Sequence, residues 1–281
     1  MNSLRIAIIG AGRMGQGLGT ALATRGQNVT LLGRRAQDVI APFSLADAWA
    51  PTLRSCQVVL IATPDSAVES IAAELAGLGV IGSHHVVLHL AGPLDRTVLA
   101  PLDGSGAGLG SFHPLQTVAD PASAAERLIG AYAGLEGDER AVETGKRLAK
   151  LLQMTPFVIP AGGKAKYHAG AVLAANFTVG LFGAAQRMAT EAGIDSDAAG
   201  KMYGPLLEGA VKNILSLGSA EALTGPIRRG DLSTIRLHLG ALSARDQELY
   251  RTVGLAVLGL ARTAGLAEER AKQVQALLEG N

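Results

Sequence analysis

The chain has one cysteine in 281 residues, only 4% aromatic residues and a net charge of +1. A single cysteine excludes an internal disulfide framework and is typical of a protein from a reducing cytosol. Cys56 lies just before the apolar run "VVLIA", so we expect a buried small side chain rather than a nucleophile. The small net charge gives no overall field that would attract nucleic acid or an acidic membrane, and we expect neither as a partner.

Long hydrophobic runs are also missing. No stretch approaches the ~18 continuous apolar residues of a membrane span, and the apolar run in "MNSLRIAIIG" is too short for a secretion signal. The apolar fraction of 48% is that of a globular protein. A chain of 281 residues is long enough to form one large domain or two smaller ones. The composition predicts a cytoplasmic protein without a membrane segment.

The first residues follow the pattern of a nucleotide-binding unit. A β-branched run at 4–10 predicts a buried strand, and "GAGRMG" follows it directly. Apolar residues then recur every fourth position to Leu22, which predicts a helix, and 28–33 predicts the next strand. Strand, glycine turn, helix and strand in this order form the context that a dinucleotide fingerprint requires.

The glycines have separate physical roles in such a turn. Gly10 permits a tight turn, Gly12 lets the backbone approach a pyrophosphate, and Gly15 lets the helix pack closely on the strand. The free N–H groups at the start of the helix would bind the anion. The predicted cofactor-binding residues of this turn are Gly10, Ala11, Gly12, Arg13, Met14 and Gly15.

Further strands are predicted at 56–65, 84–92, 106–116 and 155–160, with a helix at 138–153. Ligands of open α/β sheets bind at the carboxyl ends of the strands. The residues at two of these ends are predicted to contact the cofactor: Thr63, Pro64, Asp65, Ala91 and Gly92.

The end of the second strand indicates which dinucleotide binds. An NAD enzyme usually has an acid there for the ribose 2′-hydroxyl, but this chain has Gly33, 23 residues after Gly10. Arg34 and Arg35 follow and would supply guanidinium groups to a 2′-phosphate. We therefore predict NADP(H) as the cofactor, with Arg34 as the main contact and Arg35 as the second.

After Pro160 the pattern is helical only. A long helix is predicted from about Gly163 to Ala192, and others near 197–217, 231–241, 244–264 and 267–279, with N-caps at Asp231 and Ser243. The predicted class is α/β, with a Rossmann-like, mostly parallel sheet followed by an all-helical domain. We expect an NADP-binding domain at 1–160 and a helical substrate or dimerisation domain at 161–281.

Three motifs in this order carry a resemblance that covers nearly the whole chain: "SFHPLQT" (111–117), "KAKYHAGAVLAANF" (164–177) and "ALTGPIRRGD" (222–231). They resemble the Rossmann-like reductases with a helical C-terminal domain of unknown function. The architecture is similar to ketopantoate and pyrroline-5-carboxylate reductases, 6-phosphogluconate and 3-hydroxyisobutyrate dehydrogenases, and deazaflavin-dependent NADP reductases. The resemblance implies hydride transfer, a homodimer joined through helices, and a site where the two domains meet.

Reduction of a carbonyl needs a donor for the oxygen and groups that orient the substrate. Lys164 and His168 are four residues apart and share one face of the long helix, and His113 follows a predicted strand. Relatives of the 3-hydroxyisobutyrate type use a Lys-x-x-x-Asn pair. Matching Asn176 to that asparagine places Val172 at the lysine position, whereas matching Lys164 to the lysine places His168 at the asparagine position. Asn176 lies about 80° around a regular helix from His168, so it is predicted to flank the site.

The loop "TGPIRRGD" offers Thr224, Arg228 and Arg229 to a carboxylate or phosphate. The family pattern has one arginine before Gly-Asp, which matches Arg229. A metal site in "HHVVLH" (84–89) is not expected, because alternate residues of a strand face opposite ways and no acid or cysteine lies nearby.

The sequence thus predicts an NADP-dependent oxidoreductase that reduces a small carbonyl or imine compound bearing a carboxylate, such as a 2-oxo acid. One alternative is a non-catalytic NADPH-binding sensor whose helical domain serves dimerisation, because the lysine pattern is broken. A second alternative is a dehydrogenase of a phosphorylated sugar acid, which needs phosphate binding at Arg228 and Arg229.

Overall fold

The computed structural model describes residues 3–33, 49–118 and 120–280. The chain divides into two compact units, Met1–Val179 and Gly180–Asn281, and each is considered by itself. The boundary between them falls inside one continuous helix, Lys164–Glu191, whereas the last strand of the described chain ends at Val158. The division of the functional domains at residue 160 stays a prediction.

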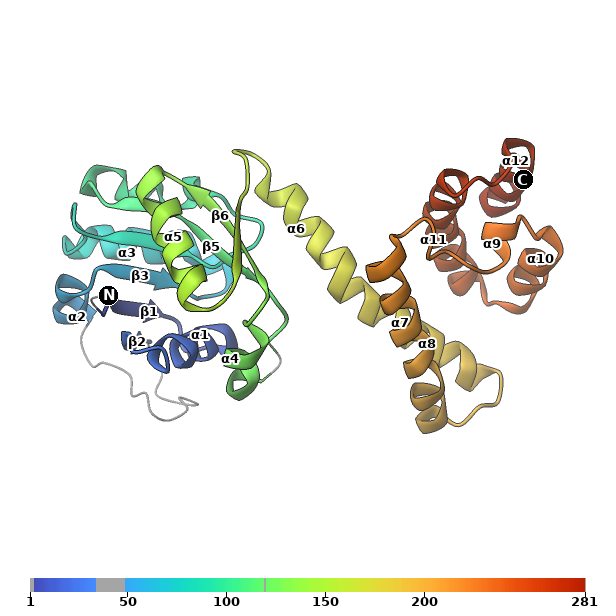
Figure 1. The fold of residues 1–281 in the computed structure, drawn as a ribbon, viewed down its shortest axis with the longest axis horizontal. Coiled ribbons are helices and arrows are strands. Elements are labelled where there is room, and N and C mark those ends of the chain that lie inside the picture. The colour runs from blue at the N-terminus through green and yellow to red at the C-terminus, as the bar shows by residue number, and fades with distance from the viewer. Residues whose placement is uncertain (1–2, 34–48, 119, 281) are drawn as a thin grey trace. The chain divides into compact units, whose positions relative to one another are not determined.

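The first unit is built on a seven-stranded sheet (Figure 1). The strands lie in the order β2-β1-β3-β4-β5-β6-β7, and all neighbours are parallel except β5 and β6. The prediction of a Rossmann-like, mostly parallel sheet is confirmed. The strands are β1 (Arg5–Ile9), β2 (Asn28–Leu32), β3 (Val58–Ile61), β4 (Val86–His89), β5 (Gly108–Leu115), β6 (Tyr132–Gly137) and β7 (Thr155–Val158).

Strand β6 was not predicted from the sequence. Its residues, "YAGLEG", contain neither a β-branched residue nor a continuous apolar run. Its place is fixed by pairing on both edges, antiparallel to β5 and parallel to β7. A strand held between two neighbours in this way is determined by tertiary contacts that local propensity does not record.

Helices cover both faces of the sheet. On one face, α1 and α5 pack on a core that includes Ile6, Leu60 and Leu88. On the other face, α3 packs on a core that includes Val59 and Val87. The helical segments of this unit are α1 (Arg13–Ala23), α2 (Trp49–Ser55), η1 (Asp65–Ala67), α3 (Val68–Leu78), η2 (Arg96–Ser105), η3 (Pro121–Ser123), α4 (Ala124–Arg127), α5 (Glu139–Leu151), α6 (Lys164–Val172) and the π-helical turn η4 (Leu173–Phe177).

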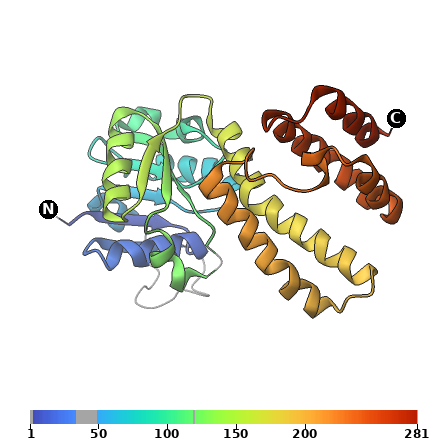
Figure 2. The ribbon, with the colours of Figure 1, turned by 45° about the vertical axis from the view of Figure 1, so that its right-hand side comes forward.

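The described part of the second unit is helical, as predicted. It has its own small core around Ile235, Leu258 and Val274. The α8 helix folds back beside α7 after the turn near Gly193 (Figure 2). The remaining helical segments are α7 (Thr178–Glu191), α8 (Ser196–Leu217), α9 (Pro226–Arg229), α10 (Leu232–Ala241), α11 (Ala244–Thr263) and α12 (Glu268–Glu279).

Both predicted N-caps are confirmed. The Asp231 carboxylate accepts a hydrogen bond from the backbone N–H of Thr234, and the Ser243 hydroxyl accepts one from that of Asp246. Short polar side chains at these positions satisfy N–H groups that the helix itself leaves unpaired. The starts of α10 and α11 are therefore encoded locally in the sequence.

By length and composition alone, the helix Lys164–Glu191 could cross a membrane. Its first residue, Lys164, is buried within the first unit, and its ammonium group bonds a backbone carbonyl there. Beyond this anchored start, its apolar window is not buried within the described structure, and Leu173, Phe177 and Val179 are exposed on it.

Candidate active site and cofactor pocket

The turn after β1 can be made only by glycine at two positions. Gly10 has a φ of +114°, and a Cβ there would lie 2.6 Å from the carbonyl oxygen of Ala62. A Cβ on Gly15 would overlap the carbonyl oxygen of Gly10. These contacts hold the turn close to β3 and the first helical turn close to the strand, so the start of α1 faces the sheet edge.

Gly12 has a different role. It is the N-cap residue of α1, and a Cβ on it would meet no atom within 4 Å. Its lack of a side chain therefore leaves open space in front of the helix N-terminus, where an anion can approach the N–H groups. Arg13 is exposed beside this space, whereas Met14 is partly buried against the hydrophobic core.

A pocket of about 350 Å³ lies at the carboxyl ends of β1, β2 and β3. The buried hydroxyl oxygen of Thr63 has no hydrogen-bond partner in the described part of the chain, so a polar ligand group could satisfy it. The pocket is lined by Ile9, Gly10, Ala11, Leu32, Gly33, Trp49, Thr63, Pro64, Ala67, Ser70 and Ile71.

The residues present fit a dinucleotide. The open space at Gly12, the glycine turn and the unpaired Thr63 hydroxyl lie at the sheet edge where such cofactors bind. Gly33 lines the pocket without adding a charge. The predicted phosphate contacts, Arg34 and Arg35, lie outside the described residues.

A row of polar side chains crosses the sheet near this edge. His89 of β4 pairs with Ser111 of β5, and Ser111 pairs with Glu136 of β6, so all three point to the same face. All three are buried, and within the described ranges neither Nδ1 of His89 nor the Ser111 hydroxyl has a hydrogen-bond partner. Buried polar atoms without partners are rare in proteins, and such positions are candidates for ligand contact.

Lys164, the first residue of α6, reaches this row. The side chain is buried, and Nζ donates a hydrogen bond of 3.0 Å to the carbonyl oxygen of Ala91, just after β4. Burial lowers its pKa from 10.5 to about 8, against the opposing effect of Glu136, Asp65 and Asp95. At neutral pH the site therefore holds a buried ammonium ion close to its deprotonation range.

Burial also shifts the pKa values of Glu136 and His89, which lie near Lys164. The Glu136 carboxylate accepts a 2.8 Å hydrogen bond from the backbone N–H of Arg96, yet burial raises its pKa. Burial, assisted by the charge of Lys164, lowers the pKa of His89 to about 4. Perturbed groups gathered at the carboxyl edge of an α/β sheet are the usual mark of a reactive site.

The next polar group along β5 is His113. Its Nδ1 lies 2.9 Å from the hydroxyl of Tyr167, and its ring meets that of His168 edge-on at 5.4 Å. Burial, followed by the charges of Lys164, His168 and His89, lowers the pKa of His113 to about 3. Burial also raises the pKa of Tyr167 to about 12. At neutral pH both partners of this hydrogen bond are uncharged.

A second pocket of the first unit, of about 270 Å³, brings predicted residues together. It includes His113, His168 and Asn176, whereas Lys164 lies outside its lining and bonds Ala91 instead. Its full lining is His113, Pro114, Leu115, Gln116, Thr117, His168, Ala171, Val172, Ala174, Ala175 and Asn176.

Gly92 makes room for one of these residues. A Cβ on Gly92 would overlap Nδ1 of His168, so the imidazole ring lies directly against the backbone after β4. That Nδ1 is buried and has no hydrogen-bond partner in the described structure. The cofactor contact of Gly92 stays a prediction, and what the structure shows is that this glycine leaves the space that the His168 ring occupies.

Asn176 shares this pocket because the helix is irregular. In a regular α-helix Asn176 would be about 80° from His168. The helix contains a π-helical turn at Leu173–Phe177, and each residue of such a wider turn advances by a smaller angle. The turn therefore shifts Asn176 toward the face of His168. Nothing in the sequence marks it, which is why Asn176 was expected only to flank the site.

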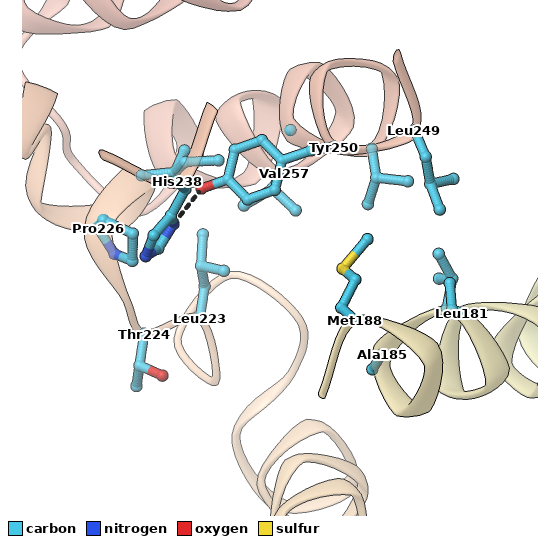
Figure 3. Close-up of a pocket in the computed structure, with 14 residues that line it drawn as sticks. Leu181, Ala185, Met188, Leu223, Thr224, Pro226, His238, Leu249, Tyr250 and Val257 are labelled. Atoms are coloured by element: carbon cyan, nitrogen blue, oxygen red, sulfur yellow. Dashed lines mark hydrogen bonds between the residues drawn. The ribbon is translucent and has the colours of Figure 1, made fainter. Parts of the chain in front are cut away.

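The second unit gathers the residues of the predicted anion site. Thr224, Arg228 and Arg229 line one open pocket of about 570 Å³ beside Gly265. Thr224 also borders an apolar pocket of about 440 Å³ between α7 and α11 (Figure 3). At that pocket His238 and Tyr250 form a hydrogen bond of 2.9 Å.

Within the described ranges, no group of three or more His, Cys, Asp or Glu side chains could hold a metal ion. Cys56 is buried as expected, its thiol donates to the carbonyl oxygen of Leu53, and burial raises its pKa to about 11. A thiol that keeps its proton is a poor nucleophile.

Several site residues were missed from the sequence. Tyr167 stands between Lys164 and His168 in "KAKYHAG", and a helical-wheel reading could have included it. His89 lies within the strand predicted at 84–92, and its position near the carboxyl end of that strand was a usable signal. Ser111 and Glu136 could not be found, because their role depends on the unpredicted pairing of β5 with β6.

Known structures share this fold over nearly the whole chain. A protein from Thermotoga maritima has 24% identity and a TM-score of 0.73, covering 92% of this chain and 99% of that one. A Bacteroides fragilis protein described as an NADP oxidoreductase has 20% identity and a TM-score of 0.69, with 93% and 98% covered. Pyrroline carboxylate reductase from Plasmodium falciparum, solved with NADP bound, has 12% identity and a TM-score of 0.65, with 99% of each chain covered.

At these identities the likeness establishes the fold. No curated protein matches the sequence. Two family models do match, one of them described as "NADP oxidoreductase coenzyme F420-dependent" and the other as a domain of unknown function, DUF2520. Residues 5–87 match the model of the NADP oxidoreductase family, and residues 131–257 match that of the DUF2520 domain.

Proposed function

We propose that this NADP-dependent oxidoreductase reduces a small carbonyl or imine compound in the pocket that His113, His168 and Asn176 line. The observation that carries the proposal is the gathering of these side chains beside the buried ammonium of Lys164 at the carboxyl edge of the sheet. Reduction needs hydrogen-bond donors at the heteroatom that gains negative charge, and these residues are such donors.

The cofactor would be held by Gly10, Ala11, Gly33, Thr63 and Pro64 around the first pocket, with its anionic part at the start of α1. When bound, NADPH supplies a hydride to the substrate. Lys164 would keep positive charge close to the reacting carbonyl or imine, since its ammonium bonds Ala91 next to Gly92. His168 and His113 would orient the heteroatom, and the Asn176 carboxamide would bind a second polar group of the substrate.

A carboxylate on the substrate is supported by the chemistry of Arg228 and Arg229. These two arginines and Thr224 line a pocket of the second unit that could bind a carboxylate group. If the pair bound a phosphate instead, the substrate would be a phosphorylated sugar acid.

The test is consumption of NADPH with a panel of 2-oxo acids, cyclic imines and phosphorylated sugar acids. Lys164→Ala and His168→Ala should each lower turnover by about a hundredfold or more, while the affinity for NADPH changes little. Lys166→Ala, an exposed lysine on the same helix, is the matched control. Full activity of both site variants would contradict the assignment, and NADPH binding without turnover on any compound would favour the sensor.

The preference for NADPH over NADH is proposed to come from Arg34 and Arg35. A hydrogen bond to a charged group contributes roughly 1.5–3 kcal/mol, so Arg34→Ala should weaken NADPH binding about ten- to a hundredfold. NADH binding should hardly change and is the internal control. Equal affinity of the native protein for NADPH and NADH would refute this explanation.

We also propose that the protein is a cytoplasmic homodimer joined through its helical unit. The 22-residue α8 buries only Ala199, while Leu206, Ile214 and Leu215 are exposed. A second copy of this chain could cover such apolar side chains. Sedimentation should give a dimer for the native protein and a monomer for Leu206→Lys/Leu215→Lys; a native monomer at micromolar concentration would overturn the proposal.

A further inference from the structure

Tyr167 occupies a position prepared for its ring. It extends from α6 and packs edge-on against Phe157, with ring centroids 5.6 Å apart, and against His113 at 5.7 Å. Gly134, which pairs with His113 across β5 and β6, leaves the space for the hydroxyl, because a Cβ there would lie 3.2 Å from the Tyr167 oxygen. The tyrosine is thus held on three sides with its hydroxyl at Nδ1 of His113.

The direction of the hydrogen bond between them follows from their donors and acceptors. If Nδ1 of His113 carried the ring proton, it would donate to the Tyr167 oxygen, and the tyrosine proton would need another acceptor. The described residues provide Tyr167 with no hydrogen-bond partner other than His113. A partly buried hydroxyl without an acceptor is unfavourable. With Tyr167 donating to Nδ1, the hydroxyl proton has an acceptor and the imidazole proton resides on Nε2.

The charges around His113 keep it neutral, so a tautomer is defined. Lys164 and His168 face it from α6 and His89 faces it from β4, while Glu136 lies on the same face of the sheet from β6. Burial and the positive groups hold the pKa of His113 at about 3, and the pKa of Tyr167 at about 12 keeps its hydroxyl protonated. A doubly protonated ring, which would donate from both nitrogens and reverse the hydrogen bond with Tyr167, is thereby avoided.

We propose that Tyr167 is a positioning residue that holds the proton of the His113 imidazole on Nε2, where it can hydrogen-bond the heteroatom of a carbonyl or imine substrate. This role rests on the proposed reductase function. It assigns His113 the part of a neutral hydrogen-bond donor, which stabilises negative charge as it develops on the heteroatom. The proton on Nε2 is then set by the fold before any ligand binds.

The direct test is the tautomer of His113 in the protein without cofactor or substrate. In ¹⁵N NMR of histidine-labelled protein, His113 should show a protonated Nε2 and an unprotonated Nδ1 from pH 5 to 8. The signal is assigned by its loss in His113→Gln. A native spectrum with the proton on Nδ1, or with a charged ring at pH 6, would overturn the proposal whether or not any variant folds.

Tyr167→Phe removes only the hydroxyl and should turn His113 into a mixture of both tautomers. The chain contains a matched control, because Tyr250 makes the same 2.9 Å contact with Nδ1 of His238 in the second unit. Tyr250→Phe should alter the His238 signal alone. An unchanged His113 signal in folded Tyr167→Phe would show that the hydroxyl does not determine the tautomer, and would contradict the proposal.

Kinetics separate this role from a structural one. With a substrate found in the panel, Tyr167→Phe should lower kcat roughly tenfold, as for loss of one neutral hydrogen bond, with little change in KM for NADPH. Tyr250→Phe should keep native kcat. If no panel compound is reduced, the proposed function fails, and the NMR measurement of the His113 tautomer still tests the role of Tyr167. If Tyr167→Phe changes the tautomer but leaves kcat unchanged, Tyr167 has no role in turnover.

Discussion

The buried ammonium group of Lys164 is expected to lower the stability of the protein while it serves the reaction. Burial disfavours its charged form, and the only hydrogen bond it makes to a described residue is to the carbonyl oxygen of Ala91. Lys164→Met keeps the length of the side chain and removes the charge. At pH 7 we expect this variant to unfold at a higher temperature than the native protein and to lose most of its turnover.

The pH dependence of the free energy of unfolding tests the prediction for Lys164→Met. In the folded protein Lys164 loses its proton near pH 8, whereas in the unfolded chain it does so near 10.5. Between these values the unfolded state binds more protons, so the stability of the native protein rises with pH, on the order of 2–4 kcal/mol in total. The advantage of Lys164→Met should be largest below pH 8 and should shrink toward pH 10.5. An advantage that does not vary between pH 7 and 10 would show that Lys164 is not buried as an ammonium.

At Gly92 the absence of a side chain determines the position of another residue. Gly92→Ala places a methyl group where the His168 ring lies, so the imidazole must move. We expect turnover to fall at least tenfold and overpacking to lower the free energy of unfolding by about 1–3 kcal/mol. Gly77→Ala is the control: this residue lies in α3 with open space at its Cβ, and alanine should stabilise the helix by about 0.5–1 kcal/mol. Native turnover in Gly92→Ala would show that the position of the His168 ring does not matter to the reaction.

Single residues of the site differ in how far the sequence predicted them. His113 and His168 could be proposed because they stand at a strand end and at a helix start, positions that local patterns reveal. Their contact with each other, and the bond of His113 to Tyr167, depend on where α6 packs on the sheet. The buried pairing of His89, Ser111 and Glu136 depends on strand register, which no single stretch of sequence encodes.

At the scale of an element, the π-helical turn can be removed by deleting one residue. Deleting Leu173, which is exposed, should restore a regular α-helix in which Asn176 follows His168 by seven residues and lies about 20° from it, on the same face. We therefore expect this deletion to keep helicity by circular dichroism and most of the turnover, with unchanged NADPH affinity. Inserting one alanine after Leu173 should instead turn Asn176 by about 100° away from His168 and lower turnover at least tenfold. Full activity of the insertion would mean that the position of Asn176 does not matter to the reaction.

Helices and strands also differ in whether the local sequence or tertiary contacts determine them. The boundaries of α8, α10, α11 and α12 agree with the predicted helices within two residues because caps and periodicity define them locally. Strand β6 and the π-helical turn were missed, since both exist only through the neighbours that hold them. The fold class was predictable from alternation alone, whereas the shape of the pocket was not.

For the whole molecule, the shared helix raises the question of where the chain can be divided. Composition changes at Pro160, but Lys164 and Tyr167 make their contacts within the first unit, which ends at Val179. We expect a fragment ending at Val179 to unfold cooperatively and one ending at Pro160 to unfold at a lower temperature, because it loses the packing of Tyr167 on Phe157 and His113. Thermal denaturation by circular dichroism compares them. Equal midpoints would place the boundary at 160.

Trp49, which lines the proposed cofactor pocket, is the only tryptophan of the chain. Light emitted by an indole overlaps the absorption band of a reduced nicotinamide, so energy passes between the two when they are close. Excitation of the native protein should therefore report cofactor occupancy directly, as loss of indole emission and gain of nicotinamide emission. No labelling is needed, and the optical signal does not depend on knowing the substrate.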